Sequence, residues 1–304
     1  MTNIDERLDV SVLIATCGRP QALFRCLEGL AAAPMPPREV IIVDQGNDPP
    51  NADRLPARIG PVPLDRLRQE RRGLAAARNL ALVNASSRLV GITDDDCVPS
   101  PEWLSAATAA LADPMLGAVC GPVIPLPDPT GTLMPVSTRP AKNATTFSRA
   151  LAPWRIGSGG NLVARRDWLV RVGGYDERLG SGSPGRAGED VDLLHRLLRA
   201  GALIRFEPAA QVFHEQKPHA DRRARRFGYG HGVGAACSLW ARERDPLAPA
   251  VLGAWLALRL RLLAGACVRR RGSAAVEELL VLRGTAEGVV YGLRTHAPRR
   301  EALP

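Results

Sequence analysis

The chain is poor in cysteine, lysine and aromatic residues, and each shortage argues against a class of protein. Its six cysteines are spread over 304 residues without a C-x-x-C pair, so a disulfide scaffold is excluded and a reducing compartment is expected. Only two lysines are present, Lys142 and Lys217, which counts against the glycine- and lysine-rich phosphate loop of a nucleotidyltransferase. Aromatic residues make up 4% of the chain and do not alternate with basic ones along a strand, so no nucleic-acid partner is expected.

Long hydrophobic runs are also missing. The N-terminal segment MTNIDERLDV carries three acidic residues before the first apolar run, the reverse of a signal peptide, so export is not expected. The longest apolar stretch after Asp245, PLAPAVLGAWLAL, ends at Arg259 after 13 residues. A membrane span needs about 20 residues, so a transmembrane helix is not expected and the protein is predicted to be cytoplasmic.

Positive charge is concentrated at one end of the chain. The formal net charge is +9, from 40 basic and 31 acidic side chains, in a sequence that is 45% hydrophobic and therefore expected to fold. Residues 1–216 contain 24 of each sign, whereas residues 217–304 contain 16 basic and 7 acidic side chains. We therefore divide the chain into a neutral domain, 1–216, and a basic tail, 217–304, whose patterns are helical.

Strand and helix patterns alternate through the first hundred residues. The apolar runs at residues 10–16, 39–44 and 88–93 are strand-like, and residues 20–33 and 73–85 have helical spacing. This alternation predicts an α/β fold with a mostly parallel sheet flanked by helices. Because ligands bind at the carboxyl ends of such strands, Thr16, Asp44 and residues 94–96 should lie along one edge.

The remainder of the chain is less regular. Six prolines in residues 122–140 predict a loop without packed structure, and residues 188–201 predict a helix that ends at Gly201. His214 is expected at the end of a strand that begins near Leu203. The glycine-rich segment 227–234 either brings backbone close to an acceptor or is a flexible joint between helices of the tail. The last helix of the tail has an apolar stripe from Leu279 to Leu293.

The three consecutive aspartates are candidate metal ligands. On an extended backbone alternate side chains share a face, so Asp94 and Asp96 converge while Asp95 points away. Two convergent carboxylates suit a divalent cation that also binds phosphate oxygens. The alternative is a solvated acidic turn.

Three other features carry chemistry with an ordinary structural alternative. Glu189 and Asp190 open a helix, where they serve either as a cap and a first-turn acid or as a general base for an incoming hydroxyl. His214 is either a structural residue or a contact to metal or diphosphate. Arg78, with Arg71 and Arg72, either holds phosphate or is a solvated charge on a helix face.

Six segments in order resemble the family 2 glycosyltransferases with the GT-A fold. The resemblance covers roughly residues 8–216. The first loop departs from the family pattern, because Cys17-Gly18 stands where the family often has an aromatic residue and an asparagine. The matching segments are VSVLIATCGRP, EVIIVDQGND, GLAAARNLAL, GITDDDCVPSPEWL, GSGGNLVARRDWLVRVGGYDERLG and GEDVDLLHRLLRAG, closing with VFHE.

The resemblance implies transfer of a sugar from a nucleotide-sugar to a hydroxyl acceptor, with inversion at the anomeric carbon. Asp190 would be the base, with Glu189 beside it, and Asp96, Asp94 and His214 would hold Mg²⁺ or Mn²⁺. Nucleotide-sugar contacts are expected from Thr16, Arg19, Asp44, Arg72, Arg78, Asp94 and Asp95, and acceptor or sugar contacts from Gly159, Gly160, Asn161 and Trp103.

The basic tail suggests where the protein works. Two arginine clusters, 222–226 and 269–271, flank an apolar stretch with Trp240 and Trp255, a composition suited to an anionic membrane interface. A peripheral enzyme on the inner face of the cell membrane, with a lipid-linked or cell-envelope acceptor, is therefore expected. The alternatives are that the tail helices pack on the catalytic domain, that the protein is a nucleotidyltransferase, or that it is a non-catalytic basic protein binding membrane or nucleic acid.

Overall fold

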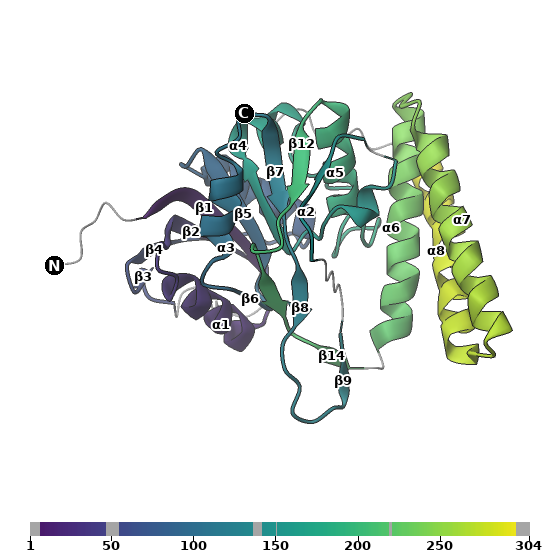
Figure 1. The fold of residues 1–304 in the computed structure, drawn as a ribbon, viewed down its shortest axis with the longest axis horizontal. Coiled ribbons are helices and arrows are strands. Elements are labelled where there is room, and N and C mark those ends of the chain that lie inside the picture. Colours follow the sequence, from purple (N-terminus) through teal and green to yellow (C-terminus); the bar gives the residue numbers. More distant parts are fainter. Residues whose placement is uncertain (1–6, 47–54, 136–141, 150, 219–220, 296–304) are drawn as a thin grey trace.

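The protein combines an α/β unit with a bundle of three long C-terminal helices that stands along one side of it (Figure 1). The computed structural model describes residues 7–46, 55–135, 142–149, 151–218 and 221–295. The expected α/β class, with a large central sheet flanked by helices and a helical C-terminal extension, is confirmed.

The central sheet has nine strands in the order β10-β12-β7-β11-β5-β1-β2-β4-β3. Strands β5, β1, β2 and β4 run parallel, as the alternation of strands and helices predicts. Beyond them the sheet is mixed, because β11 is antiparallel to both β5 and β7. The bounds are β1 Leu8–Thr16, β2 Pro37–Asp44, β3 Arg58–Ile59, β4 Val62–Arg68, β5 Leu89–Asp94, β7 Leu116–Cys120, β10 Thr145–Phe147, β11 Asn161–Arg165 and β12 Leu203–Phe206.

Helices cover both faces of the sheet, because alternate apolar residues of each buried strand point to opposite sides. Val12 and Ile14 face one core, formed with α1 (Pro20–Ala31) and α3 (Trp103–Ala110). Leu13 faces the other core, formed with α2, α4 and α5. These helices span Leu74–Asn84, Arg166–Arg171 and Glu189–Arg199, and a short 3-10 helix, η1, spans Pro153–Arg155.

Two small sheets correct two of the sequence predictions. Residues 122–140 do not form a structureless loop, since β8 (Val123–Pro125) joins a sheet with β6 (Cys97–Pro99) and β13 (Val212–His214), and β9 (Leu133–Met134) pairs with β14 (Lys217–Pro218). Residues 136–141 lie outside the described part of the chain. The strand expected from Leu203 to His214 is two strands in different sheets, and the register of β13 sets His214 opposite Cys97.

The C-terminal bundle consists of α6 (Arg222–Arg242), α7 (Ala248–Val268) and α8 (Gly272–Arg294). Segment 227–234 is not a joint between helices, because it lies inside α6. Its glycines allow α6 and α8 to pack backbone against backbone. A Cβ at Gly230 would lie 2.0 Å from the Val281 carbonyl oxygen, and one at Gly288 would lie 2.0 Å from that of His231.

The apolar helix α7 is longer than the sequence count indicated, since it continues through Arg259 and Arg261 to Val268. By length and composition alone it could cross a membrane. Most of it is exposed, and it contacts the rest of the bundle through a few residues such as Val251 and Trp255. The expectation that this stretch is too short to span is therefore wrong as a statement about length.

The bundle is joined to the α/β unit mainly through α6. Trp240 Nε1 donates to Asp192 Oδ1 of α5 at 2.8 Å, and the Trp240 ring stacks on buried His195 with 3.8 Å between ring centroids. His195 Nε2 lies 2.9 Å from Asp245, between α6 and α7. The tail helices therefore pack on the α/β unit, which was one of the alternatives that the sequence left open.

The close α6–α8 contact yields a stability prediction. We expect Gly230→Ala to lower the free energy of unfolding by about 1–3 kcal/mol, because its Cβ would overlap the Val281 carbonyl. Gly228 is the matched control on the same helix, since a Cβ there meets nothing within 4 Å. Gly228→Ala should be neutral or stabilise by up to about 1 kcal/mol through helix propensity. Thermal unfolding of both variants tests this, and equal effects would contradict the packing argument.

Candidate functional site

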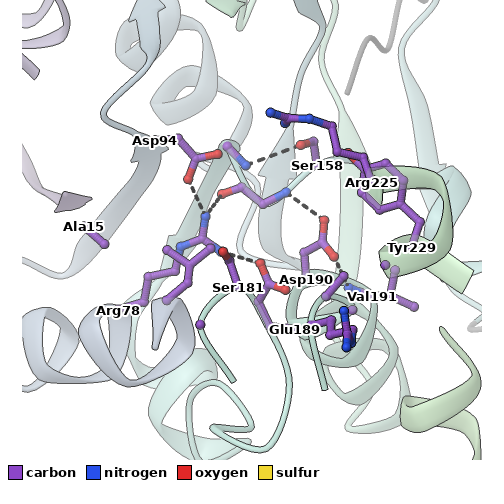
Figure 2. Close-up of a pocket in the computed structure, with 18 of the residues that line it drawn as sticks. Ala15, Arg78, Asp94, Ser158, Ser181, Glu189, Asp190, Val191, Arg225 and Tyr229 are labelled. Atoms are coloured by element: carbon purple, nitrogen blue, oxygen red, sulfur yellow. Dashed lines mark hydrogen bonds and ion pairs between the residues drawn. The ribbon is translucent and has the colours of Figure 1, made fainter. Parts of the chain in front are cut away.

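The predicted edge of the sheet holds polar side chains from three adjacent strands. The register pairs Thr16 with Asp44 and Ala15 with Asp94, so the ends of β1, β2 and β5 lie side by side. A cavity of about 890 Å³ opens at this edge, and its far wall is formed by the C-terminal bundle. Figure 2 shows Arg78 and Asp94 on one side of Asp190 and Arg225 and Tyr229 of α6 on the other.

The aspartate triplet alternates as expected. Asp94 and Asp96 line the cavity, whereas Asp95 turns into the protein, where it accepts a hydrogen bond from Thr16 Oγ1 at 2.7 Å. Arg19 bridges Asp95 at 2.5 Å and Asp96 at 2.6 Å. Burial raises the pKa of Asp95 to about 6, against the lowering effect of Arg19. The solvated acidic turn is thus excluded.

Asp96 lies among three basic side chains. Lys217 Nζ is 2.7 Å from Asp96 Oδ2, Arg19 Nη1 is 2.6 Å from the same oxygen, and His214 Nε2 is 3.6 Å from Oδ1. Burial acts to raise the pKa of Asp96, but its interactions with His214, Arg19 and Lys217 outweigh burial and hold that pKa below its usual value. Asp96 is therefore a carboxylate at neutral pH.

The cluster fits a hard divalent cation. One donor atom each from Asp94, Asp96, Cys97 and His214 lies within 4.8 Å of the others. Burial raises the pKa of the Cys97 thiol well above its usual value, so this residue stays neutral and is a poor ligand. His214 Nδ1 lies 2.6 Å from the Glu215 carbonyl oxygen, and a proton donated there leaves the Nε2 lone pair facing Asp96. Two carboxylates and one imidazole remain as ligands for Mg²⁺ or Mn²⁺.

Arg78 is a buried connector rather than a solvated charge. Only 2% of its side chain is exposed, and its guanidinium group donates to Asp94 at 2.7 Å, to the Gly159 carbonyl at 3.0 Å and to Glu189 at 3.3 Å. These bonds tie α2 to β5, to the loop before β11 and to α5. Its donors are used by the protein itself, so Arg78 orders the cavity wall.

Glu189 and Asp190 occupy the first turn of α5, but neither is its N-cap. That position is Gly188, in the left-handed region with φ of 87°, and no side chain caps the helix. Asp190 Oδ2 instead accepts from the Gly159 N–H at 3.1 Å, and Oδ1 accepts from the Val191 N–H at 2.7 Å. Asp190 is half-buried and lines the cavity, so one face of its carboxylate is open to a ligand.

Glu189 is more deeply placed and titrates near neutrality. Burial raises its pKa to about 7, the negative charge of Asp190 adds to this, and Arg78 opposes it. A protonated Glu189 places no negative charge beside Asp190. Glu189 is therefore suited to setting the electrostatics beside Asp190 rather than to carrying a fixed charge.

The raised pKa of Glu189 predicts a pH-dependent stability difference. In the folded protein Glu189 holds its proton from its ordinary pKa of 4.5 up to about 7, so its contribution to stability falls as pH rises through this range. We expect Glu189→Gln to match the wild type near pH 4.5 and to be more stable at pH 8 by up to about 3 kcal/mol. Urea unfolding at both pH values measures this, with the exposed Glu28→Gln as control. A stability difference that does not change with pH would contradict it.

The structure places several predicted contact residues away from the cavity. Trp103 Nε1 donates to Asn161 Oδ1 at 2.8 Å, and the Asn161 amide donates to the carbonyls of Pro122 and Ala210. Both side chains are buried in the core between strands and α3, where they fix the start of β11. Neither lines the cavity, so the geometry gives no direct route to an acceptor or sugar.

The other predicted residues lie at or beside the cavity. Asp44 is buried behind its edge; its Oδ1 accepts from the Gly46 N–H, while Oδ2 accepts no hydrogen bond from the described residues and has Arg68 at 4.0 Å. A Cβ at Gly159 or Gly160 would lie 2.7–3.0 Å from Arg78, Asp190 or Asp94, so these glycines allow the site to close on itself. The predicted residues that line the cavity are Thr16, Arg19, Arg72, Arg78, Asp94, Asp96, Gly159, Gly160, Glu189, Asp190 and His214.

Sequence reasoning missed one cation and most of one wall of the site. Lys217 was assigned to the tail, but β14 brings its ammonium group onto Asp96. Its position three residues after His214 was the available signal. On the bundle side, the sequence indicated only that segment 227–232 could approach an acceptor, and Gly228 and Tyr229 of this segment do line the cavity. Trp154, Arg225, Trp255 and Arg259 left no local signal, because the contact between bundle and cavity is tertiary.

The chain resembles known glycosyltransferases in its fold and in its sequence. The GT-A fold is shared with the mannosyltransferase PcManGT from Pyrobaculum calidifontis, solved with GDP-Man and Mn²⁺, at a TM-score of 0.64 and 21% identity over 96% of this chain and 89% of that one. S. aureus TarS 1–349, solved with UDP-GlcNAc, matches at a TM-score of 0.57 and 16% identity over 98% and 100%. The family model "Glycosyl transferase family 2" matches residues 11–173, and the chain belongs to this family.

The chain is also similar to curated relatives. It is 30% identical over 267 residues to the pre-mycofactocin glycosyltransferase of Mycobacterium tuberculosis, covering 83% of this chain and 53% of that protein. It is 23% identical over 247 residues to the hyaluronan synthase of Pasteurella multocida, covering 70% and 25%. The chain thus spans about half the length of the first of these relatives and a quarter of the second.

Proposed function

We propose that the protein is an inverting, metal-dependent glycosyltransferase that moves a sugar from a nucleotide-sugar to a hydroxyl acceptor by a single displacement. The observation that carries this is the position of Asp190 in the same cavity as the cluster of Asp94, Asp96 and His214. One side of the cavity can hold a cation and a diphosphate, and Asp190 can take a proton on the other. One base is enough for a displacement with inversion.

The residues that line the cavity would have separate roles in this reaction. Asp94, Asp96 and His214 would hold the divalent cation, which would supply positive charge to the leaving diphosphate. Arg19 and Lys217, which already lie within 2.7 Å of Asp96, add positive charge on that side. Asp190 accepts the proton of the acceptor hydroxyl as the new bond forms, and the Gly159 N–H keeps its carboxylate oriented.

The relatives support this choice of reaction and donor class. The curated relatives named above are a glycosyltransferase and a polysaccharide synthase, and the structural relatives were solved with GDP-Man or UDP-GlcNAc. Family membership favours sugar transfer over nucleotidyl transfer and over a binding-only role. One relative contains Mn²⁺, which supports a divalent cation in the cluster.

We also propose that the protein acts at a membrane surface. Leu260, Leu262 and Val268 of α7 are exposed, and the exposed Arg269, Arg270 and Arg271 follow directly. Apolar side chains beside arginines suit an anionic lipid surface, so we place the enzyme on the cytoplasmic face of the cell membrane, with a lipid-linked or cell-envelope acceptor. Sedimentation with phosphatidylglycerol vesicles should retain the protein, and phosphatidylcholine vesicles should not. Equal retention by both would contradict the electrostatic part.

A donor screen tests the proposed reaction. With Mn²⁺ present, the correct nucleotide-sugar should stabilise the fold by about 2.7 kcal/mol at about 100 times its Kd, with GDP-mannose and UDP-GlcNAc as first candidates. Turnover of that donor should release a nucleoside diphosphate. Release of pyrophosphate would instead identify a nucleotidyltransferase, and no stabilisation by any nucleotide-sugar would overturn the proposal.

A further inference from the structure

Part of the cavity wall comes from the C-terminal bundle, and no role described so far uses it. Residues of α6, α7 and α8 line the cavity. Figure 2 shows Arg225 and Tyr229 of α6 on the side of Asp190 that faces away from Asp94. The contact is close, because a Cβ at Gly232 of α6 would lie 2.4 Å from the backbone of Ala187, next to the turn that carries Glu189 and Asp190. The bundle is therefore built against the proposed base.

The bundle side of the cavity has an aromatic and apolar wall. Trp154 of η1 and Trp255 of α7 meet edge to face, with 5.1 Å between ring centroids. Val233 and Val281 lie beside them and are buried. Such a wall suits a ring or an apolar chain, which it would remove from water.

The same side carries more positive than negative charge. Arg259 is 12% exposed, stacks on Trp255 at 4.0 Å and shares Glu278 with Arg226. Burial lowers the pKa of Arg259, and the nearby positive charge of Arg226 lowers it further, whereas Glu278 acts to raise it. Keeping this arginine cluster charged therefore costs free energy. The described ion pairs set the four arginines Arg222, Arg225, Arg226 and Arg259 against the three carboxylates Asp221, Glu277 and Glu278.

Two further arginines line the cavity. Arg225 is half-buried, and its ion pair with the exposed Asp221 is long, at 3.4 Å. This pair therefore contributes little stability and is easily exchanged. Arg186, across the cavity on the loop before α5, has no ion pair within the described residues and lies over the Phe227 ring at 5.4 Å. Both guanidinium groups are available for an anion.

Gly228 marks the open part of this surface. Other glycines of α6 are explained by close backbone packing, since a Cβ at Gly230, Gly232 or Gly234 would lie within 2.4 Å of another segment. Gly228 lines the cavity, and a Cβ there would meet nothing within 4 Å. A glycine with open space in front of it in a helix has no packing reason, and it leaves room for a ligand.

We infer that the bundle side of the cavity is the acceptor subsite, and that it takes an acceptor with an oxyanion group, phosphate or carboxylate, attached to a ring or apolar portion. The arginines hold the oxyanion, the tryptophan wall covers the apolar portion, and the acceptor hydroxyl lies toward Asp190. The identification of this ligand as the acceptor rests on the proposed function. Anion binding at this place can be tested without it.

The experiment uses three small probes of the same ring size: phenyl phosphate, benzoate and benzyl alcohol. Binding is followed by the tryptophan fluorescence of the full chain, because Trp154 and Trp255 line the subsite. One of the two anions should bind at least about tenfold more tightly than benzyl alcohol, and the tighter anion identifies phosphate or carboxylate as the group recognised. Equal binding of all three probes would overturn the inference.

Variants locate the binding. Gly228→Leu fills the open space and should abolish probe binding, whereas Gly228→Ala should keep most of it; Arg225→Gln should weaken it about tenfold. Arg19→Gln, on the metal side, is the matched control and should leave it unchanged. Unchanged binding in both Gly228→Leu and Arg225→Gln, or loss only in Arg19→Gln, would place the probe elsewhere and overturn the inference.

Mn²⁺ binding separates this inference from the proposed function. Gly228→Leu should bind Mn²⁺ as the wild type does, because the metal cluster is on the opposite side of the cavity. If the wild type binds neither Mn²⁺ nor any nucleotide-sugar but the probes respond as expected, the proposed reaction fails and the anion subsite stands. If nucleotide-sugars bind and the probes do not, the reaction stands and the subsite fails.

Discussion

Asp190→Asn should lower kcat by about 10²–10⁴-fold while leaving the Kd of the donor unchanged, because it removes the only proposed proton acceptor and little else. The asparagine oxygen can still accept the N–H of Gly159 or Val191, which Asp190 now accepts at 3.1 and 2.7 Å, so the turn before α5 should keep its shape. Initial rates of nucleoside diphosphate release at saturating donor measure kcat, and donor titration measures Kd.

The matched control for this variant is Asp167→Asn. Asp167 is also in the first turn of a helix, α4, where its Oδ1 accepts from the Trp168 N–H, but it does not line the cavity. Wild-type kcat in the control and a large loss in Asp190→Asn assign the effect to the cavity. Wild-type kcat in Asp190→Asn would remove Asp190 as the base.

The second large effect is expected at Asp96. Asp96→Asn should weaken Mn²⁺ binding by more than the roughly 10–100-fold that residues behind the ligands usually contribute, and activity should fall with it. The reason is that Asp96 is one of the two carboxylates in the cluster of donor atoms, and an amide oxygen carries no negative charge for the cation. Titration of free Mn²⁺ by electron paramagnetic resonance measures the affinity directly.

Cys97→Ser is the control for the metal prediction. The Cys97 sulfur lies in the same group of donor atoms, but burial raises the pKa of its thiol well above the usual value, so it should contribute little to binding a hard cation. Its Mn²⁺ affinity should match the wild type. A larger loss in Cys97→Ser than in Asp96→Asn would show that the ligand set is wrong.

The metal side of the cavity could be predicted from sequence because its residues end neighbouring strands. Thr16, Asp44 and Asp94 each follow an apolar run, and the register of parallel strands brings such ends together without further information. The alternation of Asp94, Asp95 and Asp96 follows in the same way from strand geometry. These are local rules, and the structure agrees with them.

The opposite wall could not be predicted because tertiary contacts determine it. Trp103 and Asn161 have residue types suited to sugar contacts, yet they bond to each other in the core, and no pattern in sequence separates these two outcomes. Gly230 and Gly234 read as a flexible joint, although they are helical and serve close packing against α8. Glycine alone does not distinguish a joint from a close contact.

The structure shows that the basic side chains of residues 217–304 lie in two different places. The excess positive charge of residues 217–304 is not confined to the outer surface, since Arg225, Arg226 and Arg259 line the cavity. Residues 269–271, by contrast, are exposed beyond α7. The tail therefore has some arginines that line the cavity and others that are exposed at the end of α7.

A crystal structure with Mn²⁺ and the donor identified by the screen tests the central claim most directly. The account predicts the cation on Asp94, Asp96 and His214, the diphosphate on the same side near Arg19 and Lys217, and the anomeric carbon facing Asp190 across the cavity. A donor bound with its diphosphate against Arg225 and Arg259, or a cation held by residues outside the cluster, would contradict it.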